Sequence, residues 1–171
     1  MSEEVTKAAL AAKRVVIVSD THGHREVLSQ LMDKIETPDL LIHCGDLECD
    51  REQVRKIAGC PLVCVRGNCD YVSDLPGEAE ITIGKYKTWI LHGHRMGVSV
   101  TPVILMEEAL ARGIDIVMFG HTHQPLIQFY QGLTALNPGS LVYPRQEGRR
   151  ASYLTMEIDD AGEAHYNICY L

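Results

Sequence analysis

The sequence predicts an α/β protein in which two sheets pack together and helices cover their outer faces. Three observations predict it. The first half of the chain alternates short apolar runs with amphipathic segments, as β-α units do. The second half holds pairs of strand-like runs separated by short glycine turns, as antiparallel hairpins do. With 171 residues, 46% of them hydrophobic, the chain is long enough for one domain with a sizeable core.

We expect that single domain to span residues 14–171. Residues 1–13 precede it as a lead-in that is rich in alanine and carries scattered charges. That composition fits either a short helix or a flexible segment, and we assign it no function.

Three strand–helix units are predicted in the first half. The apolar, β-branched runs favour strands that are buried on both faces. Apolar side chains at a three-four spacing predict the first helix, which Thr37-Pro38 ends. The strands are expected at residues 14–19, 40–44 and 62–65, and the helices at residues 23–35 and 50–58.

Hairpins are predicted in the second half, where Gly84 and Gly162 each separate two strand-like runs. Pro102 suits the first turn of one further helix, and Gly113 ends that helix. The helix is expected at residues 102–111, and strands at residues 80–83, 85–91, 114–119, 126–130, 133–136, 151–158 and 164–170.

Charge and composition exclude several classes of protein. The formal net charge is −7, and no block of Lys or Arg is present. This argues against a protein that holds nucleic acid or an anionic membrane by general electrostatics. No apolar stretch approaches the ~20 residues of a membrane helix, and the first residues do not resemble a signal peptide. The cysteines form no C-x-x-C pair, so most of them are interpreted as small buried hydrophobes in a reducing cytoplasm.

Polar side chains of metal-ligand type follow five of the predicted strands. Each follows an apolar run, so we expect all of them to lie at the same edge of a sheet, where open α/β sheets bind their ligands. Any one alone is weak evidence, because a histidine at a strand end is more often structural and an Asp beside Gly is more often a turn residue. The seven candidates are Asp20, His22, Asp46, Asn68, His92, His121 and His123.

The chemistry of this set favours metal ions. Oxygen and imidazole ligands without thiolates suit Mn, Fe, Zn or Mg, not a structural cysteine-type zinc site. Seven ligands exceed the needs of one tetrahedral ion. Two ions that share a bridging carboxylate would use them all, and such pairs act on phosphoryl groups.

The motifs around these residues resemble those of a known family. Their order and spacing are similar to those of the calcineurin-like metallophosphoesterases, and the turn at residues 137–140 resembles the YfcE-type branch of small phosphodiesterases. The resemblance covers residues 15–143. The motifs are Asp20-x-His22, Gly45-Asp46, Gly67-Asn68-Cys69-Asp70, His92-Gly93-His94 and Gly120-His121-Thr122-His123.

This resemblance implies a four-layer α/β-β/α sandwich of two mixed sheets flanked by helices, with a two-metal site. It assigns one metal ion to Asp20, His22, Asp46 and His123, and the second to Asp46, Asn68, His92 and His121. Asp46 is then the bridging ligand. The expected cofactors are two divalent ions, with Mn first and Fe, Zn, Ni or Mg as alternatives.

The activity that the resemblance implies is metal-dependent hydrolysis of a small phosphodiester. A hydroxide held by the two ions attacks phosphorus in line with the leaving alkoxide, and the ions and the Asn68 amide stabilise the developing charge. Two alternatives stay open. One is a phosphomonoesterase that acts on a small phosphate ester or a phosphoprotein. The other is a non-catalytic scaffold similar to the retromer subunit built on this fold.

Cys69 departs from the pattern of many relatives, which have histidine at this position to protonate the leaving group. A thiol, with an ordinary pKa of about 8.5, is a poorer acid partner at neutral pH. Its presence therefore favours diesters whose leaving groups need little protonation. The alternative is that Cys69 only fills a turn. For Asp70 the two interpretations are a hydrogen bond to a ligand histidine and a solvated turn carboxylate.

Several other residues are secondary candidates. His94 lies one glycine beyond His92 and is expected to face the substrate or to support a ligand. Arg145, Arg66 and Arg95 are either solvated surface residues or groups that reach a phosphate oxygen. Trp89 is expected in the core. With so few aromatic residues, the chain offers no platform for stacking bases, so no stable nucleic-acid binding is expected. The expected partner is a small phosphate ester, and a homodimer is compatible with the sequence.

Overall fold

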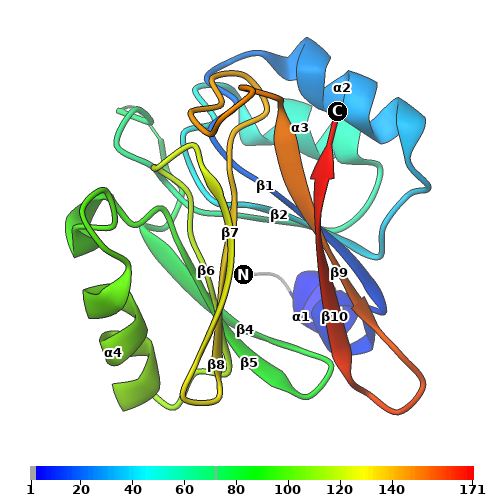
Figure 1. The fold of residues 1–171 in the computed structure, drawn as a ribbon. Helices are drawn as coiled ribbons and strands as arrows, with labels where there is room; N and C mark the ends of the chain where they lie inside the picture. The colour runs from blue at the N-terminus through cyan, green and yellow to red at the C-terminus, as the bar shows by residue number, and fades with distance from the viewer. Residues whose placement is uncertain (1–2, 72) are drawn as a thin grey trace.

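Four layers make up the fold in the computed structural model, which describes residues 3–71 and 73–171. Two five-stranded sheets lie face to face, helices cover their outer faces, and the N-terminal helix packs into the core between them (Figure 1). The predicted four-layer α/β-β/α sandwich of two mixed sheets is confirmed. The helices are α1 (Glu3–Ala11), α2 (Arg25–Lys34), α3 (Arg51–Ala58) and α4 (Val103–Ala111), with a short 3₁₀ helix, η1 (His94–Met96).

The first sheet has the strand order β10-β9-β1-β2-β3. Its β1, β2 and β3 run parallel, and the antiparallel pair β9 and β10 extends the sheet beyond β1. The crossovers through α2 and α3 place both helices on one face, where they pack on alternate residues of β1 such as Val16 and Val18. The strands are β1 (Arg14–Val18), β2 (Leu40–His43), β3 (Leu62–Cys64), β9 (Ser152–Ile158) and β10 (Ala164–Tyr170).

The second sheet has the strand order β4-β5-β6-β8-β7 and combines a parallel centre with two antiparallel edges. Its outer face is covered by α4, which packs with Trp89, Val117 and Ala135. Trp89 is 1% exposed, so its predicted place in the core is confirmed. The strands are β4 (Glu78–Ile83), β5 (Tyr86–Leu91), β6 (Ile116–Met118), β7 (Pro125–Tyr130) and β8 (Leu133–Pro138).

The main hydrophobic core lies between the two sheets. Val15 and Ile17 alternate along β1 with the residues that face the helices. They pack against Ile90, Met118 and Leu136 of the opposite sheet. Because both faces of the central strands are buried, these strands are continuous apolar runs. The inner core therefore fixes how the ends of one sheet stand relative to the ends of the other.

The lead-in contributes a helix to this fold. Of the two predicted alternatives, the helix is the one observed, as α1, while residues 1 and 2 lie outside the described residues. Val5 and Ala9 of α1 are buried in the core between the sheets, and α1 contacts β4. The other predicted elements are all present, and the strands β3 and β6 are shorter than predicted, β6 at both of its ends.

Candidate metal centre

The candidate ligands come from the ends of strands in both sheets. Asp20 and His22 follow β1, and Asp46 follows β2, whereas His92 follows β5 and His123 follows β6. The prediction that all of them lie at the edge of one sheet is therefore wrong. The alternation of apolar runs and polar turns is the same in both sheets, so the sequence pattern does not distinguish one edge from two facing edges.

Hydrogen bonds tie the strand ends of the two sheets together. Nδ1 of His92 lies 2.8 Å from the carbonyl oxygen of Cys44, and the backbone N–H of His121 donates to Oδ2 of Asp20 at 3.1 Å. The turn at residues 137–140, after β8, adds a third contact, because the Ser140 hydroxyl donates to the carbonyl oxygen of Asp20 at 2.8 Å. These contacts hold the ligand turns at fixed separations.

Two buried carboxylates form the middle of the site. Asp20 is 0% exposed and Asp46 is 2% exposed. Among the described residues no hydrogen bond reaches Oδ1 of Asp20, although Nε2 of His123 lies 3.1 Å from it. Oδ2 of Asp46 lies 3.3 Å from Nε2 of His92 and 4.0 Å from Nε2 of His22. A buried carboxylate without a full set of hydrogen bonds requires a nearby positive charge.

The imidazole rings are held so that their Nε2 atoms face these carboxylates. Nδ1 of His92 contacts a carbonyl oxygen, as described above, and Nδ1 of His123 contacts the carbonyl oxygen of Tyr143 at 2.7 Å. A carbonyl oxygen only accepts, so each Nδ1 carries the proton, and the neutral ring presents a lone pair at Nε2. Nδ1 of His22 lies 2.5 Å from Oε1 of Glu48. Fixing the far nitrogen in this way is how proteins orient histidine ligands of metals.

The electrostatics of the site follow from this arrangement. Burial on its own raises the pKa of Asp20 and of Asp46, but the neighbouring histidines outweigh it and hold both pKa values below the ordinary value. Burial lowers the pKa of His92, but Asp46 and Asp20 raise it further, so the net shift is upward. The carboxylates therefore stay ionised at neutral pH, and the site attracts cations.

The structure brings five of the seven predicted ligands together in two overlapping groups that share Asp20. The ligand atoms of Asp20, His22 and His123 lie within 4.8 Å of one another, as do those of Asp20, Asp46 and His92. A third such group joins His22 and Asp46 to Cys69, for which the sequence leaves open a poor acid or a turn residue and predicts no ligand role.

The other two predicted ligands lie at the margin of this cluster. Oδ1 of Asn68, at the end of β3, is 3.0 Å from Nε2 of His92. The ring of His121 lies 5.2 Å from the ring of His92, and burial beside His92 lowers its pKa. Its nitrogens are not in the groups whose ligand atoms lie within 4.8 Å of one another among the described residues.

Backbone strain is concentrated at the site. Eight of the described residues other than glycine have positive φ, and six of them are in its turns: Asp20, His22, Asp46, Glu48, His121 and His123. The left-handed conformation costs a residue with a side chain roughly 1–2 kcal/mol. Such strain is typical of functional sites, where the surrounding contacts impose it.

Asp70 differs from both of its predicted interpretations. Asp70 is only 7% exposed, and among the described residues no hydrogen bond or ion pair joins it to a candidate ligand histidine. It accepts three backbone N–H bonds, from Asp46 at 2.9 Å, Glu48 at 2.7 Å and Gly67 at 2.8 Å. Asp70 therefore links the turn after β2 to the turn after β3.

Cys69 also contacts its neighbours at the centre. Its backbone N–H donates to Oδ1 of Asp46 at 2.8 Å, and the Asn68 amide donates to its sulfur at 3.2 Å. Burial and the neighbouring Asp46 carboxylate raise the pKa of its thiol to about 12. The thiol is therefore a weak acid in this structure, and its part in the reaction remains a prediction.

The secondary candidates lie on two sides of the centre. The ring of His94 lies 5.5 Å from the ring of His92 in a tilted arrangement, and Nδ1 of His94 is buried without a hydrogen-bond partner among the described residues. Arg66 and Arg95 line the same cavity as these two histidines. Arg145 is exposed and lies on the side of His123, to whose carbonyl oxygen its backbone N–H donates.

Three residues near the centre were not predicted. Glu48 contacts His22, Tyr143 places its ring 5.3 Å from the ring of His22, and His43 lies buried beneath the turns. Glu48 had a detectable signal, because it lies two residues beyond Asp46 in the same turn. Tyr143 lies far along the chain, and the strand pattern at His43 carries no sign of a role.

Comparisons with known proteins agree with this geometry. Residues 14–161 match the model of the calcineurin-like phosphoesterase superfamily domain. The chain is 37% identical over 156 residues to the "Probable metallophosphoesterase YsnB" of Bacillus subtilis, which covers 90% of each chain. It is 29% identical over 106 residues to "Phosphodiesterase YfcE" of Escherichia coli, which covers 57% of this chain and 53% of that one.

Solved structures share the fold. One is a conserved uncharacterized protein from Streptococcus pneumoniae described as a predicted phosphoesterase, with a TM-score of 0.77 and 24% identity over 95% of this chain and all of that one. Another is a single mutant of Vps29 from Entamoeba histolytica, with a TM-score of 0.71 and 20% identity over 92% of this chain and 99% of that one.

Proposed function

The chain belongs to the calcineurin-like phosphoesterase superfamily, as a phosphoric ester hydrolase, and we propose that it is a metal-dependent phosphodiesterase of small phosphodiesters. The observation that carries this proposal is the meeting of three imidazole Nε2 atoms with two buried carboxylates. The lone pair of His123 Nε2 faces Oδ1 of Asp20 at 3.1 Å. Two acceptors at that distance repel each other unless a cation or a proton lies between them.

The residues of the site fit a pair of divalent ions. We assign one ion to Asp20, His22, Asp46 and His123, and the other to Asp46, Asn68, His92 and His121, with Asp46 shared. The position of Asp46 supports this, because its Oδ2 lies between Nε2 of His22 and Nε2 of His92. The mixed oxygen and nitrogen donors suit manganese, which we propose as the metal, with iron, zinc, nickel and magnesium as alternatives.

When bound, such a pair of ions lowers the pKa of a coordinated water toward neutrality and neutralises the charge on phosphoryl oxygens. The protein residues contribute orientation and charge. Asn68 offers an amide N–H₂ at the rim of the centre, where it can donate to a phosphoryl oxygen in the transition state of in-line displacement. His94 is proposed to contact the substrate from the other side of His92.

Diesters are proposed over monoesters because no imidazole occupies the position of Cys69. The weak acidity expected of a thiol there favours esters whose leaving group departs without a proton. The relative "Phosphodiesterase YfcE" carries this activity in its name, which supports the same choice. The scaffold alternative is disfavoured, because each residue of the two-metal ligand set is present.

A comparison of two aryl esters tests the proposal. The protein is stripped with a chelator, reloaded with Mn²⁺ and assayed with bis(4-nitrophenyl) phosphate and 4-nitrophenyl phosphate. We expect turnover of the diester that depends on the metal, and little of the monoester. Preference for the monoester would instead establish a phosphatase. Asp46→Ala should abolish turnover and keep the fold, and retained activity would rule out the bridging role of Asp46.

Location and assembly extend the proposal. No helix in the described part of the chain is long and apolar enough to cross a membrane. All six cysteines are free thiols, which supports a reducing, cytoplasmic setting. The proposed partner is a small phosphate ester. A homodimer is proposed as one assembly, and sedimentation of the metal-loaded protein tests it.

A further inference from the structure

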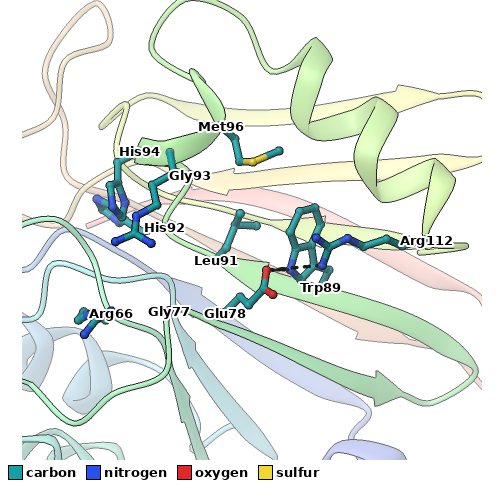
Figure 2. A pocket seen from close by; sticks show the side chains of 11 residues that line it. Arg66, Gly77, Glu78, Trp89, Leu91, His92, Gly93, His94, Met96 and Arg112 are labelled. Carbon is teal, nitrogen blue, oxygen red and sulfur yellow. Dashed lines mark hydrogen bonds and ion pairs between the residues drawn. The ribbon is translucent and has the colours of Figure 1, made fainter.

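A cavity of about 480 Å³ adjoins the metal centre on the side of the second sheet. His92 and His94 form one part of its wall, and Trp89 with Leu91 of β5 forms another (Figure 2). His92 is shared with the centre, since its Nε2 lies 3.3 Å from Oδ2 of Asp46. A molecule whose phosphate is bound at the centre would therefore have this cavity beside it. The volume suits a small organic group.

Arginines give the cavity a positive charge. Three of its lining residues are Arg66, Arg95 and Arg112, against the single carboxylate of Glu78. Arg112 is already neutralised, because it lies 2.8 Å from Glu108 and 3.5 Å from Glu78 and stacks on Trp89. Glu78 in turn accepts a hydrogen bond from the Trp89 indole at 2.9 Å. This end of the cavity is thus internally balanced.

Arg66 and Arg95, unlike Arg112, are not neutralised by neighbouring carboxylates of the described residues. Their guanidinium groups have no ion pair and no side-chain hydrogen bond in residues 3–71 and 73–171. In Figure 2 Arg66 lies on the side of the view where His92 and His94 are, and Arg112 lies on the other. In a chain of net charge −7, the partly buried Arg66 and the exposed Arg95 give the cavity two positive charges that no neighbouring carboxylate in the described part of the chain offsets. Guanidinium groups bind carboxylates and phosphates through paired N–H donors.

One further polar atom in the wall lacks a partner. Nδ1 of His94 is buried without a hydrogen bond among the described residues, and His94 lines the same cavity as Arg66 and Arg95. Buried polar atoms are nearly always hydrogen-bonded, so an atom without a partner is accounted for by a ligand or a water. Leu91 and Met96 add apolar surface beside it.

We infer that this cavity, which we call the arginine cavity, binds one alcohol substituent of the substrate. It selects phosphodiesters in which that substituent carries a second anionic group, and Arg66 and Arg95 hold this group. The inference rests on the proposed phosphodiesterase function and narrows its substrate class. The second anion is a phosphate or a carboxylate, and the test uses one substrate of each kind to distinguish them.

The test compares three 4-nitrophenyl diesters on the manganese-loaded protein. Their second substituents are propyl, 2-carboxyethyl and 3-phosphopropyl. We expect kcat/KM for at least one anionic diester to exceed that for the propyl diester by about tenfold or more, as one charge-assisted hydrogen bond provides. For each anionic diester we take the ratio of its kcat/KM to that of the propyl diester. The diester with the larger ratio identifies the second anion as a carboxylate or a phosphate. Equal values for all three would overturn the inference.

Variants connect the preference to the two arginines. In Arg66→Ala and Arg95→Ala we expect the ratio to fall toward one, with partial recovery in Arg66→Lys and Arg95→Lys. Arg55→Ala removes the same charge from the exposed face of α3, away from the cavity, and should keep the ratio of the unaltered protein. A preference that persists in the double alanine variant would also overturn the inference.

A binding measurement separates this inference from the proposed function. Titration calorimetry of the manganese-loaded protein compares propane-1,3-bisphosphonate with propylphosphonate. We expect the bisphosphonate to bind about tenfold more tightly, and to lose that advantage in the Arg66→Ala/Arg95→Ala double variant. If no diester is hydrolysed but this dependence is found, only the phosphodiesterase activity fails. If the propyl diester is hydrolysed and the dependence is absent, only the inference fails.

Discussion

Nδ1 of His22 lies 2.5 Å from Oε1 of Glu48, two residues beyond the proposed bridging carboxylate Asp46. This contact orients the ring of His22 so that Nε2 faces Asp20 at 3.9 Å. A carboxylate behind a ligand histidine raises the basicity of the ring and fixes its orientation. Glu48 therefore supports the candidate centre through His22.

We predict that Glu48→Ala weakens metal binding by about 10–100-fold, the usual effect of losing such a partner. Glu48→Gln keeps the hydrogen bond and loses the charge, so its effect should be smaller. Competition with a fluorescent chelator measures the affinity. Glu26→Ala is the matched control, because Glu26 contacts His24, which is not a candidate ligand, in the same manner at 2.9 Å. Equal affinities for the Glu48→Ala variant and the control would contradict the prediction.

Asp70 is expected to contribute stability and not catalysis. Asp70→Ala leaves three backbone N–H groups without their acceptor in a buried turn. Each such loss costs about 1–3 kcal/mol, partly relieved by water, so we expect the free energy of unfolding to fall by about 3 kcal/mol. Urea denaturation measures it. Asp74→Ala, an exposed residue a few positions along the chain, should change it by less than about 0.5 kcal/mol.

Gly67 is required for the close approach of its turn to Asp46. A Cβ added at this position would overlap Oδ1 of Asp46 and lie 2.7 Å from its Cγ. Gly67→Ala should therefore displace the carboxylate, lower the free energy of unfolding by about 1–3 kcal/mol and weaken metal binding. Gly77→Ala has no atom within 4 Å of the added carbon and should leave both quantities nearly unchanged. Normal metal affinity in Gly67→Ala would show that the turn can move.

His43 should make stability depend on pH. It is 0% exposed, its Nδ1 accepts from the N–H of Gly45 at 3.3 Å, and its Nε2 lies 2.9 Å from the hydroxyl of Thr21. Burial therefore favours the neutral ring and lowers its pKa from 6.5 to about 4. Between these values the unfolded chain binds a proton that the native state does not bind.

The sign of the effect follows from that difference. The contribution of His43 is fully present above pH 6.5 and is lost as the pH falls, with a total loss on the order of 3 kcal/mol by pH 4. Urea denaturation at pH 7.5 and pH 5, both in chelator, measures the slope. In His43→Gln the slope should be shallower. An unchanged slope would assign the acid sensitivity to other groups.

The order and type of nearly all elements are predictable from the sequence, because strands buried on both faces leave long apolar runs such as residues 15–18. The candidate ligands are predictable for a related reason, since polar residues after such runs lie at strand ends. The division of these ends between two sheets is not predictable from periodicity. His92 and Asp46 each follow an apolar run in the sequence, yet they come from opposite sheets.

Interactions formed by tertiary packing are also not predictable from the sequence. The three N–H bonds of Asp70 depend on the path of two turns that only the folded chain brings together. The contact between His123 and the carbonyl oxygen of Tyr143 joins residues 20 positions apart, and a carbonyl group has no signature in the sequence. Such contacts decide which histidine nitrogen faces the centre.

The apolar core between the sheets affects how the metal preference of such a site can change. Asp46 belongs to one sheet and His92 to the other, so the separation of the proposed metal positions depends on how far apart the sheets pack. Conservative changes at Ile17, Ile90 or Met118, all in that core, would move one set of ligands relative to the other without altering any of them. Metal preference is thus open to adjustment by hydrophobic residues that never contact an ion.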